Sequence, residues 1–163
     1  MIITPTVPDH ILSVASRLRD RDRDEFAAVF GTDDPEALAQ AMLEAYGDVD
    51  GLLTGCLDGG PVVFVGGAVW ARPNVAAILF MATDDFPRIA KAATRFIRDQ
   101  YLPQLDAEGF HRIEAVTLAS YVNMQRWLRL LGFRQEGVAE AYGANREDFH
   151  YFARVRVARP TCH

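Results

Sequence analysis

The stretch Met124-Gln125-Arg126-Trp127-Leu128-Arg129-Leu130-Leu131-Gly132-Phe133 carries the clearest structural signal in this chain. It predicts a helix over 124–131, because Gly132 stands where helices commonly end in a left-handed residue. Trp127 and the apolar ending of the stretch predict that the helix packs one side against a core. The stretch therefore predicts a short packed helix with a defined end.

Predicted strands and a long helix surround this segment. A strand over 113–118 precedes it, and two strands, near 136–142 and 149–157, follow it. Upstream, the run Thr83-Asp84-Asp85-Phe86-Pro87 predicts the start of a helix that continues to near Gly109, and Pro103 is expected to break or kink it. The apolar face of this helix consists of Ile89, Ala92, Ala93, Phe96 and Ile97.

The chain before residue 82 divides into a helical part and a β part. Apolar residues with helical spacing begin after Pro8-Asp9, a polar run covers 19–24, and the pattern resumes until Gly31; a further helix covers 34–46. Strands are predicted over 52–57, 62–70 and 75–81, and they suggest an antiparallel meander. The pair Gly66-Gly67 inside the second strand indicates a bulge or a close approach of backbones.

Composition and charge exclude several classes of protein. The 163 residues suit one domain, and a formal net charge of −5 argues against a general nucleic-acid binder. The clusters 17–23 and 126–134 mix arginines with acids or apolar residues, which favours solvated helix faces. Cys56 and Cys162 make neither a disulfide framework nor a zinc site. We see no signal peptide and no membrane span, so the expected compartment is a reducing cytoplasm.

The order strand, long helix, strand and a helix ending in Leu-Gly-Phe resembles the cofactor-binding core of GNAT N-acetyltransferases. Glu136-Gly137 and Tyr142 in the following strands also resemble that pattern. The resemblance covers about residues 8–157 of one domain spanning 1–163, with a short tail at 158–163. It implies an α/β (α+β) fold with a central mixed, mostly antiparallel sheet of about six to seven strands flanked by helices.

A narrower resemblance is to GNAT-like proteins of tailed bacteriophages, related to the internal virion protein A family. Three segments carry it: His10 to Ala15 leading to Arg19-Asp20-Arg21-Asp22, the strand ending in Ala82-Thr83-Asp84-Asp85, and 126–133. This resemblance implies a phage or prophage origin, a location in the host cytoplasm, and incorporation into the virion. It also implies other phage virion proteins, or a second copy of the chain, as partners.

The GNAT resemblance implies an acyl-CoA site at the start of the long helix, where unpaired backbone N–H groups and the helix dipole attract phosphates. The matching positions run from Arg88 to Ala93, and Lys91 replaces the first glycine of the pattern. Lys91 could offer its ammonium to a phosphate. Alternatively, Arg88, Lys91 and Arg95 form an exposed stripe on the helix that Asp84 and Asp85 balance. The candidate cofactor-binding residues are Arg88, Lys91, Ala92, Ala93 and Asn123, with acetyl-CoA as the possible cofactor.

The acid that many GNAT enzymes use is a tyrosine four residues before the Gly-Phe pair, and Leu128 stands there. The helix-opening asparagine of the family is Tyr121 here, and Asn123 is displaced by two positions. Strand 75–81 contains no acid that could serve as a base. Tyr121 and Glu114 remain the candidate catalytic residues, and a packed tyrosine and a solvent-facing glutamate are the alternatives. His111 and His150 read as surface or capping residues, and no metal cluster is expected.

Two functions remain open at this point. One is a phage GNAT-fold protein with a degenerate acyl-CoA site, serving as a virion structural or assembly component. The other is an active acetyl-CoA-dependent N-acyltransferase that acts on an unknown amine. No nucleic-acid or membrane partner is expected from either. The fold alone does not choose between them.

Overall fold

A computed structural model describes residues 1–156, and these form a seven-stranded sheet with the order β1-β2-β3-β4-β5-β7-β6. The pairing is antiparallel except between β4 and β5, which are parallel. The expected mixed, mostly antiparallel sheet is therefore confirmed. The strands are β1 (Ile2–Pro5), β2 (Leu53–Cys56), β3 (Val62–Arg72), β4 (Val75–Ala82), β5 (Arg112–Leu118), β6 (Arg134–Ala139) and β7 (Phe149–Val155).

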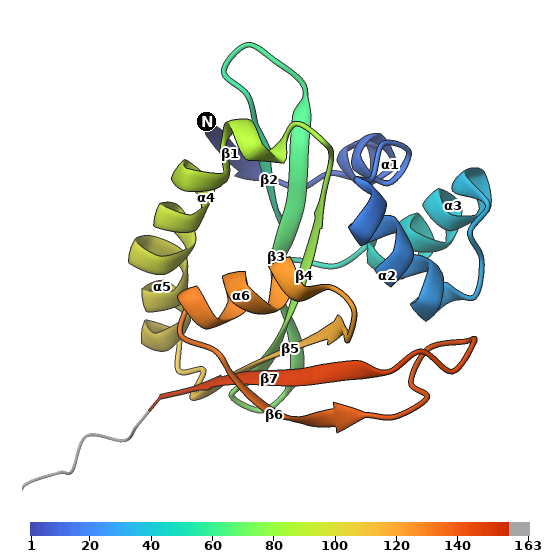
Figure 1. The fold of residues 1–163 in the computed structure, drawn as a ribbon. Coiled ribbons are helices and arrows are strands. Elements are labelled where there is room, and N and C mark those ends of the chain that lie inside the picture. The colour runs from blue at the N-terminus through green and yellow to red at the C-terminus, as the bar shows by residue number, and fades with distance from the viewer. Residues whose placement is uncertain (157–163) are drawn as a thin grey trace, which may run out of the picture.

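The helices cover both faces of the sheet (Figure 1). Three of them, α1 (Pro8–Ala15), α2 (Asp20–Phe30) and α3 (Pro35–Tyr46), lie on one side. On the other side lie η1 (Phe86–Arg88), α4 (Ala90–Phe96), η2 (Ile97–Tyr101), α5 (Leu102–Ala107) and α6 (Val122–Leu130). Within residues 1–156, no helix is long and apolar enough to span a bilayer.

Strands β4 and β5 pair over only three positions and then diverge. Their register joins Val75–Ala77 to Arg112–Glu114 and stops there, although both strands continue. Backbone N–H and C=O groups beyond the last pair lose the partner that a complete ladder would give them. The divergence therefore creates a gap in the middle of the sheet, where other groups must form hydrogen bonds with the unpaired backbone.

Three apolar clusters hold the layers together. The first packs α5 and α6 on β5 and β7 around Phe149 and Phe152, both 1% exposed. The second packs α1 to α3 on β3 and β4 around Met42 and Met81. The third joins η1 and α4 to β3 and β4 around Phe64 and Phe86. Burial of these side chains is the main stabilising contribution of the fold.

The helix predicted from the 124–133 stretch is confirmed as α6, with Gly132 at a φ of 90° just after its end. Leu128 and Leu131 are buried, whereas Leu130 is exposed. The predicted long helix runs from Ala90 to Ala107 and contains the π-helical turn η2 directly before Pro103. The proline therefore modifies this helix without ending it: Pro103 has no N–H to donate to the preceding turn, and the hydrogen bonding of that turn is π-helical.

One strand was not predicted, and one helix is less solvated than expected. The N-terminal strand β1 was not predicted, since its four residues form a strand only by pairing with β2, fifty residues away in the chain. The polar run 19–24, which was expected to be a solvated helix face, is largely the first half of α2, but its Asp22 is buried. Gly66-Gly67 makes a close approach of backbones, whereas the bulges lie at Gly55/Cys56 and Trp70/Arg72. Val157, Cys162 and the expected tail 158–163 lie outside the described residues.

Gly55 provides a test of how tightly the sheet packs. A Cβ atom added at Gly55 would lie 2.0 Å from the ring of Phe64, which is 3% exposed and cannot easily move. We expect Gly55→Ala to lower the free energy of unfolding by about 1–3 kcal/mol through overpacking. Gly137→Ala is the matched strand control, because nothing lies within 4 Å of its added Cβ. Equal denaturation midpoints for the two variants would contradict this packing.

Candidate functional site

Two carboxylates from α2 enter the gap between β4 and β5. The backbone N–H of Ala82, on β4, donates to Asp22 Oδ2 at 2.8 Å. The backbone N–H of Leu118, on β5, donates to Glu25 Oε2 at 2.7 Å. Each carboxylate thus accepts a hydrogen bond from a backbone N–H at the end of a strand, where the neighbouring strand has diverged. Because an unpaired buried N–H is costly, these two bonds help to maintain the gap.

Asp22 is the centre of a buried polar network and is 1% exposed. The hydroxyl of Tyr121 donates to its Oδ1 at 2.6 Å, and Arg19 Nε lies 3.0 Å from Oδ2. The guanidinium of Arg19 also lies over the ring of Phe86, 5.0 Å from its centroid. A buried carboxylate with a cation and hydrogen-bond donors around it is compensated for its lost hydration.

Glu25 has a different environment from Asp22. Its Oε2 accepts both the Leu118 N–H and the Thr117 hydroxyl, the latter at 2.6 Å. Within residues 1–156, no group donates to its Oε1. Burial raises the pKa of Glu25 to about 7, and the two hydrogen bonds to Oε2 only partly oppose this. Glu25 is therefore a carboxyl group that titrates near neutral pH and has one oxygen available.

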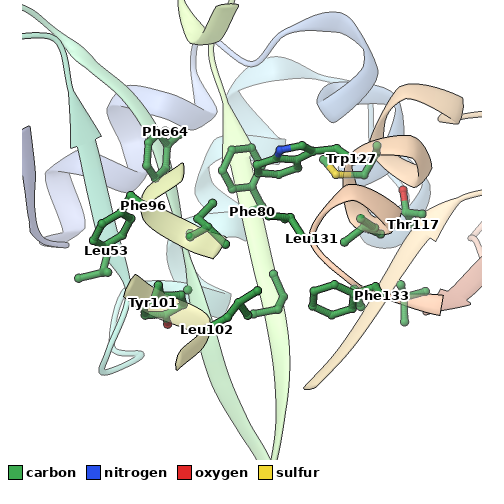
Figure 2. A pocket seen from close by; sticks show the side chains of 18 of the residues that line it. Leu53, Phe64, Phe80, Phe96, Tyr101, Leu102, Thr117, Trp127, Leu131 and Phe133 are labelled. Carbon is green, nitrogen blue, oxygen red and sulfur yellow. The ribbon is translucent and has the colours of Figure 1, made fainter. Parts of the chain in front are cut away.

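An apolar cavity of about 70 Å³ lies on the α4–α6 side of the gap (Figure 2). Glu25 and Thr117 contribute polar atoms at one edge. The remaining wall is mostly aromatic and aliphatic, and it includes Leu53, Phe64, Phe80, Phe96, Tyr101, Leu102, Trp127, Leu131 and Phe133. A volume of this size is small, although it exceeds the roughly 10–15 Å³ that a cavity needs to hold one water molecule. Apolar side chains form most of its wall.

Aromatic side chains pack across this cavity. The rings of Phe80 and Trp127 lie edge to face with centroids 4.8 Å apart, and Figure 2 shows them side by side. Phe86 packs on both, at 5.2 Å from Phe80 and 5.8 Å from Trp127. The indole N–H of Trp127 donates to Thr94 Oγ1 at 2.9 Å, so a direct hydrogen bond joins α6 to α4. These contacts fill much of the space between the two helices.

The residues predicted to bind a cofactor lie on three elements: Arg88 in η1, Lys91, Ala92 and Ala93 in α4, and Asn123 in α6. Arg88, Lys91, Ala92 and Asn123 are exposed, whereas Ala93 is completely buried against the sheet. Arg88 forms an ion pair with Asp85 at 3.1 Å. The backbone N–H groups of Arg88 and Ile89 donate to carbonyls within the η1 turn. These two donors are therefore used, whereas the N–H groups of Ala90, Lys91 and Ala92, at the start of α4, meet no backbone acceptor within residues 1–156.

The predicted catalytic pair is not brought together. Tyr121 is 5% exposed and donates to Asp22; burial, followed by the charge of Asp22, raises the pKa of its phenol far above the usual value. Tyr121 is thus a packed tyrosine held in its neutral form. Glu114 forms ion pairs with Arg72 and Arg112, and their hydrogen bonds lower its pKa below the usual range. An acid with a lowered pKa is a poor proton acceptor.

Other positions weighed from the sequence have structural roles. Leu128 is buried among the residues that line the cavity and has no proton to donate. Nδ1 of His150 is buried without a partner in the described part of the chain. Among residues 1–156, no group of three or more His, Cys, Asp or Glu side chains could hold a metal ion.

Sequence reasoning missed Asp22 and Glu25. Arg19, Asp22 and Glu25 recur every third residue, so they lie close together at the start of α2 and face the sheet. The alternating charges of 17–24 concealed this pattern, since they are typical of a solvated helix. A signal was present in the two apolar turns that flank the segment, which place one side of the helix against a core.

Solved structures of known proteins share this architecture. The S18-alanine N-acetyltransferase of Escherichia coli has a TM-score of 0.69 and 13% identity, and the match covers 99% of both chains. A phosphinothricin acetyltransferase of the GNAT superfamily from Sinorhizobium meliloti, solved with acetyl-CoA, has a TM-score of 0.69 and 16% identity over 99% of this chain and 91% of its own. The chain has the GNAT fold.

A third GNAT-type match extends over nearly the whole chain as well. The ribosomal-protein-alanine N-acetyltransferase of Brucella melitensis has a TM-score of 0.67 and 14% identity, covering 95% of this chain and 99% of its own. Comparison with protein-family models and with curated proteins finds no match. At these identities the GNAT fold is established by structure, and the activity is a separate question.

The raised pKa of Glu25 leads to a prediction about pH. Because the folded pKa of about 7 exceeds the ordinary value of 4.5, the native state holds more protons than the unfolded chain between these values. The contribution of Glu25 to stability is therefore full below the unfolded pKa and is lost as pH rises through the folded pKa. We expect the free energy of unfolding to fall between about pH 5 and pH 8 by roughly 1–3 kcal/mol more in the wild type than in Glu25→Gln.

Urea denaturation at a series of pH values measures this difference. The Glu25→Gln substitution keeps an oxygen for the Thr117 and Leu118 donors, so the variant retains the local contacts. Asp24→Asn is the matched control, since Asp24 is the exposed neighbour on α2 and its ion pair with Arg21 is long, at 3.7 Å. Parallel pH curves for the wild type and Glu25→Gln would contradict the assignment.

Proposed function

We propose that this GNAT-fold protein does not catalyse acyl transfer and that it acts as a structural or assembly component. The observation that carries the proposal is the hydrogen bond from Trp127 to Thr94, with Phe80 and Phe86 packed against the same indole. This arrangement joins α4 to α6 across the space that leads into the β4–β5 gap. Opening that space would separate the partly buried rings of Phe80 and Trp127 and break a hydrogen bond between the helices.

The residues present do not fit acetyl-CoA in the way that the family resemblance implies. At the phosphate end, Lys91 replaces a glycine, and the acidic residues Asp84 and Asp85 precede the helix. Within the gap, Asp22 and Glu25 already accept from the backbone N–H groups of the two strand ends. The cavity beside them holds about 70 Å³, which is far smaller than ordinary ligand pockets of roughly 300–1,000 Å³.

The proposed setting is the assembly of a bacteriophage particle. This rests on the resemblance of three segments of the chain, around residues 10–22, 82–85 and 126–133, to GNAT-like phage proteins. The packed cleft supports such a role, because a protein that serves through its surface has no need of an open cofactor site. Other virion proteins or a second copy of the chain are the proposed partners.

An active N-acyltransferase is the second candidate, and one observation favours it. Glu25 has a pKa of about 7 and lies in the gap between β4 and β5 with one carboxylate oxygen available. A carboxyl group that titrates near neutral pH is suited to accept a proton from an amine. This alternative requires the Trp127–Thr94 contact to open when a cofactor binds.

Acetyl-CoA binding separates the two candidates. A ligand at 100 times its dissociation constant adds about 2.7 kcal/mol to stability. We expect millimolar acetyl-CoA to give no heat of binding and no rise in melting temperature. The Sinorhizobium meliloti acetyltransferase serves as the positive control, since its structure contains acetyl-CoA. Saturable binding followed by acetylation of an amine would overturn the structural role.

Mass spectrometry of purified particles tests the proposed setting. If the chain is a virion component, its tryptic peptides are expected in particles purified from a lysate of the phage or prophage that encodes it. Their amount should follow that of known structural proteins through density-gradient fractions. Peptides found only in the lysate, with none in the particle fractions, would contradict the virion role and leave the acetyl-CoA result unaffected.

A further inference from the structure

The charged residues of this chain are distributed unevenly along the sequence. From residue 24 to residue 71 the chain contains nine acidic residues and no lysine, arginine or histidine. The segments 86–98 and 115–133 contain four and two basic residues, respectively, and no acidic residue. The formal net charge of −5 therefore includes regions of opposite sign, and the proposed function does not yet use this asymmetry.

Helix α3 and the turns on either side of it carry an acidic face. Its acids are all exposed, namely Asp33, Asp34, Glu36, Glu44, Asp48 and Asp50. None of them forms an ion pair within residues 1–156. Asp34 and Glu44 accept hydrogen bonds from neutral donors on α3 itself, which leave their charges uncompensated. The acidic face therefore attracts cationic groups from outside the molecule.

Helices α4 and α6 carry a basic face on the other side of the sheet. Its cations are exposed and form no ion pair in the described part of the chain, and they are Lys91, Arg95, Arg126 and Arg129. In Figure 1, α3 lies at the right of the sheet and α4 at the left. The uncompensated charges of opposite sign are thus separated by the thickness of the molecule.

Exposed apolar side chains accompany the charges on both faces. Val122 and Leu130, which are 49% and 64% exposed, share one side of α6 with its two exposed arginines, because these residues have i, i+4, i+7 and i+8 spacing. On α3, the exposed Ala37, Glu44 and Ala45 have the same spacing. Stable interfaces combine a buried apolar centre with a polar rim. The two faces therefore match in charge, and each offers apolar groups that a contact would bury.

The positions of the two faces determine the kind of assembly that they can form. A contact between the acidic face of one copy and the basic face of another joins two different patches, so it is heterologous. Because the faces lie on opposite sides of the sheet, two copies that make this contact leave one acidic and one basic face free. Further copies can therefore add at both ends.

We propose that copies of this chain associate head to tail, with the acidic face of one copy against the basic face of the next, into an open-ended assembly. The inference deepens the proposed structural or assembly role, on which it rests, by naming a second copy of the chain as the partner. Attraction between unlike faces orients the copies, and repulsion between like faces disfavours a two-fold dimer through either face.

Sedimentation velocity of the full chain, at neutral pH and without acyl-CoA, tests this. At about 0.1 M salt the Debye length is about 10 Å, so the overall repulsion between chains of net charge −5 is largely screened, whereas charges in contact still attract. We expect the average sedimentation coefficient to rise with protein concentration and to pass the value for a dimer. At about 1 M salt the Debye length is about 3 Å, and we expect the association constant to fall by about tenfold or more.

Two charge-reversal variants locate the contact. Arg95→Glu with Arg126→Glu reverses two cations of the basic face, and Glu44→Lys with Asp48→Lys reverses two acids of the acidic face. Each variant alone is expected to associate about tenfold or more weakly than the wild type. An equimolar mixture of the two should recover association, because the unchanged acidic face of the first fits the unchanged basic face of the second. The two reversed faces are also opposite in sign, so the mixture can continue to grow.

A matched control separates the positions of the charges from the net charge. Asp9→Lys with Glu140→Lys changes the net charge by the same amount as the acidic-face variant, from exposed positions outside both faces. We expect this control to change the association constant by less than about twofold. Urea denaturation of every variant shows whether it is folded.

Several outcomes would overturn the proposal. A chain that stays monomeric at the lower salt concentration has no such contact, and a dimer that does not grow further uses a closed, two-fold interface instead. Association that survives high salt or both reversals is not driven by these charges. A mixture of folded variants that fails to reassociate would show that the two faces do not meet. None of these measurements includes acetyl-CoA or phage particles, so failure here is separate from failure of the proposed function.

Discussion

The divergence of β4 and β5 is the constraint on which the rest of this structure depends. Two strands that separate after three paired positions leave backbone donors that water, a ligand or the protein itself must satisfy. Here Asp22 and Glu25 of α2 supply the acceptors for Ala82 and Leu118. Helix α2 is thereby fixed to both halves of the sheet, and the gap becomes part of the folded core.

The two carboxylates in the gap, Asp22 and Glu25, have different hydrogen-bond partners. Asp22 is surrounded by Tyr121, Arg19 and a backbone donor, so its role is structural. Glu25 has neutral donors on one oxygen and none within residues 1–156 on the other, and burial raises its pKa to about 7. Two acids one helical turn apart thus differ in function because their neighbours differ.

The aromatic packing on the α4–α6 side and the open groove on the α2 side give the two faces of the gap different character. On the first, Phe80, Phe86 and Trp127 pack against one another, and Trp127 joins α6 to α4 through Thr94. On the second, Phe26, Tyr46 and Tyr142 leave a hollow of about 330 Å³. The fold alone does not decide this difference, which comes from the side chains on the two faces.

Local patterns of residues were enough to predict the helices, most of the strands and the end of α6 at Gly132, because periodicity, capping residues and glycine act over a few neighbouring positions. The resemblance to GNAT enzymes, and not a local pattern, placed Leu128 where a proton donor would stand. The pairing of β1, the burial of Tyr121 and the ion pairs of Glu114 emerged from the folded chain alone, since each depends on partners far away in the chain. The same holds for Glu25, whose sequence neighbours suggest a solvated helix. Its pKa and its free oxygen arise from contacts with residues 117 and 118, more than ninety positions later, which no local pattern encodes.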